Sequence, residues 1–140
     1  MLAGTVLLAG CQQKVVSNEK PHSIEGVWIP ESGEFDGDVI KHKDLLTSSK
    51  LTIDKNQYAF QEPTGEQQAG RIAINDKSDP KSFDLEFLEG PNKGKKSLGI
   101  FKIADNKLAM CFGDPGKERP SAFVTVKGSG QTVLNLVKKQ

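Results

Sequence analysis

Apolar and polar residues alternate along most of the chain between residues 50 and 137, which is the period of a half-buried β-strand. The clearest run is Phe83, Leu85 and Phe87, with one polar residue between each pair. Turn-forming Gly, Pro, Asn and Asp residues separate this run from its neighbours. The pattern predicts short antiparallel strands joined by hairpin turns, with the other runs at Leu51–Ile53, Tyr58–Phe60, Gly70–Ile74, Leu108–Phe112, Phe123–Val126 and Thr132–Val137.

Two segments depart from simple alternation. Apolar residues of Leu98–Ile103 change parity at Ile100-Phe101, which indicates either a bulge or a strand that is covered on both faces. Asp38–Ser48 has apolar residues at a spacing that fits one side of a short helix.

Eight or nine short sequential strands must close or stack in order to hide their edges, and this favours an up-and-down barrel over a sandwich. We therefore expect an all-β fold: an antiparallel barrel of about eight strands with one short helix, formed by residues 24–138 as a single domain. Two polar stretches, Gly33–Asp38 and Gly113–Pro120, are expected to be its long loops.

The start of the chain differs in character from the rest. Its apolar run ends in Leu8-Ala9-Gly10-Cys11, which resembles the lipobox of bacterial lipoproteins. That resemblance implies a signal peptide over residues 1–10, a lipid on Cys11 and a flexible tether over residues 11–23. No Lys or Arg precedes Cys11, so the signal resembles one that lacks its basic beginning; the alternative is a core strand or helix.

A lipid on Cys11 would place the protein in the cell envelope. It would be anchored to a membrane, with the domain facing the periplasm or the exterior.

Several stretches carry a resemblance to known folds. Gly26-Val27-Trp28 is similar to the G-x-W opening of lipocalin-like barrels, in which the Trp closes the barrel floor. Three further stretches resemble a small uncharacterised domain family of planctomycete proteins: Asp79–Leu85, Gly94–Phe101 and Leu108–Gln131. The resemblance implies a lipocalin-like barrel and no known activity. The chain departs from the family at Phe101, where Tyr is frequent.

Charge and motif content narrow the classes of function. The 19 basic and 18 acidic residues are mixed along the chain, so we expect no nucleic-acid partner. The two histidines, His22 and His42, have no metal-ligand spacing, and no nucleophile or phosphate-binding motif occurs. We expect a non-enzymatic protein without a metal or cofactor.

Two single residues each leave alternatives open. Cys111 is expected to be a buried core residue on the face opposite Met110 and Phe112, although a reactive thiol has the same sequence signature. An arginine, Arg119 or Arg71, is expected to pack on Trp28 or to pair with a buried acid; the alternative is a clamp for a ligand carboxylate.

The expected function is binding of a small apolar ligand by a monomer, in the interior of the barrel. Candidate ligand-binding residues are its large apolar side chains and one arginine: Trp28, Phe60, Phe83, Phe87, Phe101, Met110, Phe123 and Arg119. The alternative is an envelope protein that binds or inhibits another macromolecule through its loops.

Overall fold

The computed structural model describes residues 24–140. The predicted signal peptide, Cys11 and tether lie outside the described residues. Strands make up most of this part of the chain, and the elements are β1 (Gly26–Phe35), β2 (Asp38–Val39), α1 (Lys43–Thr47), β3 (Lys50–Asp54), β4 (Gln57–Gln61), β5 (Gln67–Asn75), β6 (Lys81–Phe87), β7 (Lys96–Ala104), β8 (Lys107–Phe112) and β9 (Thr132–Lys138).

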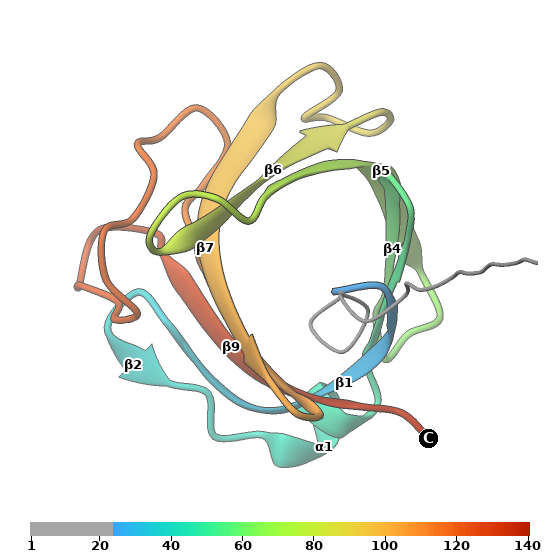
Figure 1. Ribbon diagram of the computed structural model, residues 1–140. Coiled ribbons are helices and arrows are strands. Elements are labelled where there is room, and N and C mark those ends of the chain that lie inside the picture. Colours follow the sequence, from blue (N-terminus) through green and yellow to red (C-terminus); the bar gives the residue numbers. More distant parts are fainter. Residues whose placement is uncertain (1–23) are drawn as a thin grey trace, which may run out of the picture.

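The strands form one closed antiparallel barrel (Figure 1). Strands β3 to β9 each pair with the next in sequence, and β1 closes the barrel between β3 and β9. The first residues of β1 pair with β3, and its remainder pairs with β9. The eight-stranded up-and-down barrel expected from the alternation is therefore confirmed.

Strand β1 pairs with two neighbours and contains a bulge. Its register against β9 shifts between Pro30 and Ser32, so Glu31 is the extra residue. Pro30 lies at this irregularity, where a residue without a backbone N–H is tolerated. The bulge lies beyond Trp28, in the part of β1 that pairs with β9 and no longer with β3.

Three expected elements are corrected by the structure. Residues 33–35, expected in a loop, continue β1. The predicted helix covers only Lys43–Thr47, while Asp38–Val39 form the short strand β2 against the end of β1. Phe123–Val126 is not a strand, because β8, β9 and β1 already pair with one another and leave no edge for it to join.

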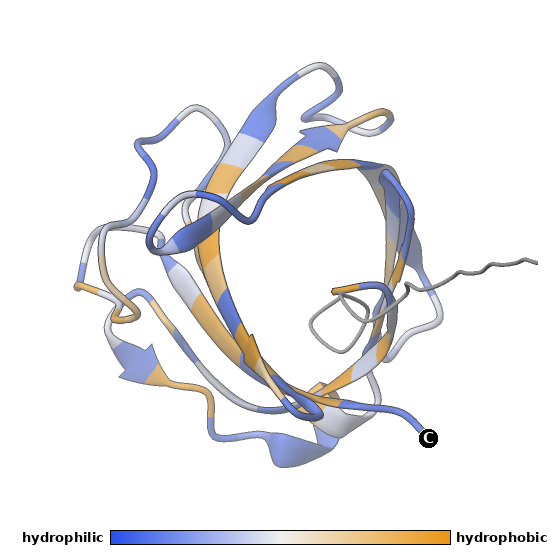
Figure 2. Cartoon of the chain, viewed as in Figure 1, coloured by the Kyte–Doolittle hydropathy of each residue, from blue (hydrophilic) through white to orange (hydrophobic). Residues whose placement is uncertain are grey.

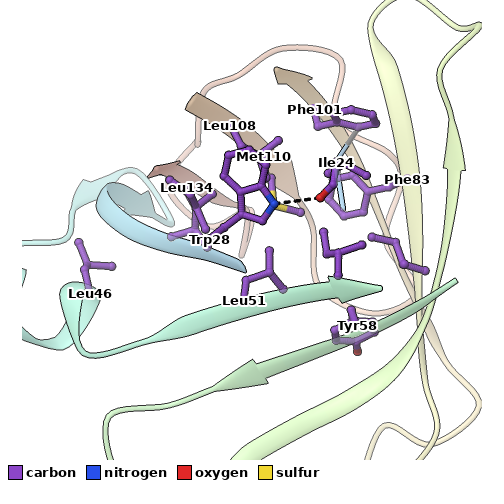
Figure 3. Packing of buried hydrophobic residues seen from close by; sticks show 13 residues of the cluster. Ile24, Trp28, Leu46, Leu51, Tyr58, Phe83, Phe101, Leu108, Met110 and Leu134 are labelled. Atoms are coloured by element: carbon purple, nitrogen blue, oxygen red, sulfur yellow. Dashed lines mark hydrogen bonds between the residues drawn. The ribbon is translucent and has the colours of Figure 1, made fainter. Parts of the chain in front are cut away.

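The barrel interior is filled at one end, which we call the floor. Trp28 is fully buried there, and its indole Nε1 donates a 2.9 Å hydrogen bond to the carbonyl oxygen of Ile24 (Figure 3). Phe83 and Phe101 pack nearby with ring centroids 6.3 Å apart. Figure 2 shows the corresponding alternation of apolar and polar residues along the strands.

A second, smaller core lies outside the barrel. Ile100, Cys111 and Val133 point outward from three adjacent strands, and Phe123 covers them. Phe123 belongs to residues 113–131, which we call the outer strap; Figure 1 shows this segment along the outside of β7 and β9. Strand β7 keeps an unbroken register with both neighbours, so its parity change reflects burial on both faces and not a bulge.

Candidate functional site

The end of the barrel opposite the floor contains an apolar cavity of about 220 Å³. The even strands β4, β6 and β8 finish at this end and the odd strands β5, β7 and β9 begin there, because the strands run up and down. We call this hollow the interior cavity. Its walls are formed by Leu51, Tyr58, Phe60, Gln68, Ile72, Leu85, Phe87, Ser97, Met110, Phe112 and Leu134.

Three phenylalanines lie toward the mouth of the interior cavity. Phe60, Phe87 and Phe112 come near the ends of β4, β6 and β8, and each side chain is half-buried. Deeper residues such as Ile72 and Met110 are almost fully buried. The cavity therefore combines a closed apolar bottom with an aromatic rim that solvent reaches.

Two of the lining residues carry a hydroxyl group. Ser97 donates a buried hydrogen bond of 2.5 Å to the carbonyl oxygen of Gly113, so its donor is occupied. The Tyr58 hydroxyl is buried and has no hydrogen-bond partner among the described residues. Desolvation by burial raises the pKa of Tyr58 above its ordinary value, so the phenol stays neutral and able to donate a hydrogen bond.

Gly70 is important for the placement of Tyr58. Tyr58 on β4 is directly opposite Gly70 on β5, and a Cβ at Gly70 would come within 2.9 Å of the tyrosine ring. The same arrangement recurs deeper in the barrel, where the Phe83 ring covers Gly99 on the neighbouring strand. Each glycine leaves the space that an opposing aromatic ring fills.

The structure brings together part of the predicted ligand-binding set. Phe60, Phe87 and Met110 line the interior cavity. Phe83, Phe101 and Trp28 lie in the filled part of the barrel and not among the cavity residues. Sequence reasoning missed Tyr58, Ser97 and Gln68 as cavity residues, although the alternation places Tyr58 on the same face as Phe60.

Phe123 lies outside the barrel and not in its interior. The prediction followed from the expected strand Phe123–Val126, and that strand is absent. In the structure Phe123 packs on the outward-facing cluster around Cys111, and the Lys102 Nζ lies 4.8 Å from its ring centroid.

Arg119 also lies outside the barrel. Its Nη1 donates 2.9 Å hydrogen bonds to the carbonyl oxygens of Phe83 and Gly99, and its Nη2 lies 2.7 Å from the Asp84 carboxylate. The acid partner is part-exposed and not buried, and Arg71 reaches only the exposed side of Glu86 at 3.8 Å. Neither arginine packs on Trp28; the Lys138 Nζ lies 5.7 Å from the Trp28 ring instead.

Cys111 is buried on the face opposite Met110 and Phe112, as predicted. Its thiol lies 3.7 Å from the carbonyl oxygen of Val124 in the outer strap. Desolvation by burial raises the pKa of Cys111, which lowers the fraction of thiolate at neutral pH.

Two features are absent from residues 24–140. No group of three or more His, Cys, Asp or Glu side chains in this range could hold a metal ion. No helix within the same range is long and apolar enough to cross a membrane.

Comparison of the chain with protein-family models, with curated proteins and with solved structures finds no match. The resemblance to the planctomycete domain family therefore rests on its motifs, and membership stays a prediction.

Proposed function

We propose that this protein is a non-catalytic binding module that takes a small apolar ligand into the interior cavity. One observation carries the proposal: an apolar cavity with an aromatic mouth has in its wall a buried tyrosine whose hydroxyl lacks a partner. Pockets of this kind, mostly apolar with a few polar groups, are the usual form of small-molecule sites.

The size of the cavity limits the ligand. A dry cavity of about 150 Å³ accepts benzene, so a cavity near 220 Å³ has room for roughly eight to ten non-hydrogen atoms. A small ring or a short alkyl chain fits this limit, whereas a long lipid chain would extend beyond the mouth.

Tyr58 favours a ligand with one polar atom near the apolar group. A buried hydroxyl without a partner costs about 1–3 kcal/mol. A ligand atom within hydrogen-bond reach of this hydroxyl would recover part of that cost. The proposed ligand is therefore apolar over most of its surface and carries a hydrogen-bonding atom.

The proposal includes the location of the protein. The lipobox-like sequence supports a lipid on Cys11, and residues 12–23 would then hold the barrel near a membrane in the cell envelope. The closed barrel and the G-x-W motif support a lipocalin-like domain, and the stretches Asp79–Leu85, Gly94–Phe101 and Leu108–Gln131 support the planctomycete type. Together these features describe a lipid-anchored carrier or sensor of a small molecule.

Native mass spectrometry of the full chain, purified gently from its own host, tests the proposal. We expect a retained molecule small enough for the interior cavity. The matched variants Leu85→Trp and Leu88→Trp provide the control, since Leu85 lines the interior cavity and Leu88 is exposed just after β6. Leu85→Trp should abolish retention, and Leu88→Trp should preserve it; retention by both variants would contradict a ligand in this cavity.

A second candidate function, binding of an envelope protein through the loops, is favoured by an apolar patch. Phe35, Val39, Val124 and Val126 are all at least half exposed. They come from two segments that hydrogen bonds hold together, including a 2.8 Å bond from the Gly37 amide to the Thr125 hydroxyl. A bare mass, together with an envelope protein that crosslinks to wild type but not to Val126→Ser, would support this function instead.

A further inference from the structure

A second hollow adjoins the mouth of the interior cavity. It has a volume of about 210 Å³, and we call it the rim pocket. Gln68 and Phe87 line both hollows, so these two side chains form the boundary between them. The other walls of the rim pocket come from the start of β5 and from the turn after β6: Gln67, Ala69, Glu89, Gly90, Pro91 and Asn92.

The two hollows differ in chemistry. The interior cavity is mainly apolar, while the residues that line the rim pocket include three with side-chain amides, Gln67, Gln68 and Asn92, and the acidic Glu89. The Gln68 Nε2 donates a 2.8 Å hydrogen bond to the Glu62 Oε2, which orients the amide at the boundary between the hollows. Amides and carboxylates together offer more acceptors than donors.

The charge on the lining of the rim pocket is negative only. Glu89 is its one ionisable lining residue, and no lysine or arginine lines it. Lys93 and Lys95 of the neighbouring turn are exposed and do not belong to its walls. An anionic group in the rim pocket would meet the carboxylate without a compensating cation, which is unfavourable, although salt would screen part of the repulsion.

We infer that the ligand is a short amphiphile: an apolar group in the interior cavity and an uncharged head group with hydrogen-bond donors in the rim pocket. This inference rests on the proposed function. It excludes fatty-acid carboxylates as the preferred ligands, and it assigns selection of the head group to Glu89 and the amides around it.

Calorimetric titration of the full chain with three eight-carbon compounds tests the inference. The probes are octanamide, octane-1,2-diol and octanoate, each at neutral pH and below any micelle concentration. We expect the amide and the diol to bind at least tenfold more tightly than octanoate. Equal or tighter binding of octanoate would overturn the head-group assignment but leave the cavity proposal standing. No binding of any probe would overturn both.

Matched charge variants identify the residue responsible. Glu89→Gln should raise the affinity for octanoate several-fold, because the repulsion is removed, and should not raise the affinity for octanamide, because an uncharged amide meets no such repulsion and loses a carboxylate acceptor. Glu66→Gln removes an equivalent exposed charge from the β4–β5 loop without touching either hollow and should change neither affinity. An unchanged octanoate affinity in Glu89→Gln, or an equal rise in both variants, would show that Glu89 does not select the head group.

Discussion

Tyr58 is buried opposite Gly70, and its ring fills the space that a side chain at Gly70 would otherwise occupy. Packing therefore explains the ring but not the hydroxyl, which has no partner among the described residues. A phenylalanine would fill the same space without that penalty. The hydroxyl thus belongs to a residue that lines the interior cavity, and packing alone gives no reason for its presence.

Tyr58→Phe is expected to stabilise the free protein and to weaken ligand binding. Loss of the unpartnered hydroxyl should raise the free energy of unfolding by about 1 kcal/mol at pH 7. The affinity for a small ligand whose polar atom lies within the interior cavity, such as phenol, should fall several-fold, because the hydroxyl no longer meets that atom. Urea unfolding and calorimetric titration measure the two changes; lower stability together with unchanged affinity would contradict this role.

The same substitution should change the response to alkaline pH. Burial raises the pKa of Tyr58 in the folded protein, so the stability linked to its neutral form is fully present below the unfolded value of about 10 and is lost as pH rises through the folded value. The advantage of Tyr58→Phe should therefore grow above pH 10. Tyr58 is the one tyrosine of the chain, so tyrosinate absorbance in folded and urea-unfolded protein reports its pKa directly.

At the scale of elements, the outer strap contains no helix or strand, yet its side chains anchor it to the barrel. Arg119 attaches the strap to the backbones of β6 and β7, and Phe123 covers the outward-facing side of the sheet. The Cys111 thiol lies beneath the strap, next to the carbonyl oxygen of Val124. Access to the thiol should therefore depend on opening of the strap.

Arg119→Lys is expected to speed alkylation of Cys111 by about tenfold, because a lysine cannot reproduce three hydrogen bonds from one planar group. The rate is measured in a Cys11→Ser background, so that Cys111 is the sole thiol. Arg71→Lys is the matched control, since Arg71 only reaches Glu86 at 3.8 Å on the surface. Equal acceleration in both variants would show that Arg119 does not hold the strap.

At the scale of the whole molecule, the two ends of the barrel serve different purposes. The floor is closed by Trp28 and Ile24, and the core residues there leave little space. The opposite end keeps the interior cavity between half-buried phenylalanines. Stability should therefore depend mainly on the floor, and binding mainly on the mouth.

Trp28→Ala should lower the free energy of unfolding by about 3–5 kcal/mol, because it leaves a large void in the floor. Phe35→Ala removes a half-exposed aromatic side chain from the same strand and should cost far less. Urea unfolding followed by circular dichroism compares the two.

The milder Trp28→Phe, which keeps the floor largely filled, should retain octanamide affinity. A loss of affinity with folding intact would contradict the separation of the two ends.

The local alternation of apolar and polar residues was sufficient to predict the strands from Leu51 to Phe112, the barrel and the outward position of Cys111. Each of these depends on which face of a strand a residue occupies, and an alternation with a period of two residues indicates that face directly. The short helix was predicted for the same reason, although its limits were not. The Trp28 position at the floor followed from the G-x-W motif.

Tertiary structure decided everything that depends on contacts between distant segments. Phe123 and Arg119 could be placed only once β1 and β9 were known to pair, since this closure leaves residues 113–131 no sheet edge and places them on the outside. The division of the interior into a filled floor and a hollow mouth depends on how side chains from eight strands pack together. The chain records which residues face inward, but the space left between them is a property of the closed barrel alone.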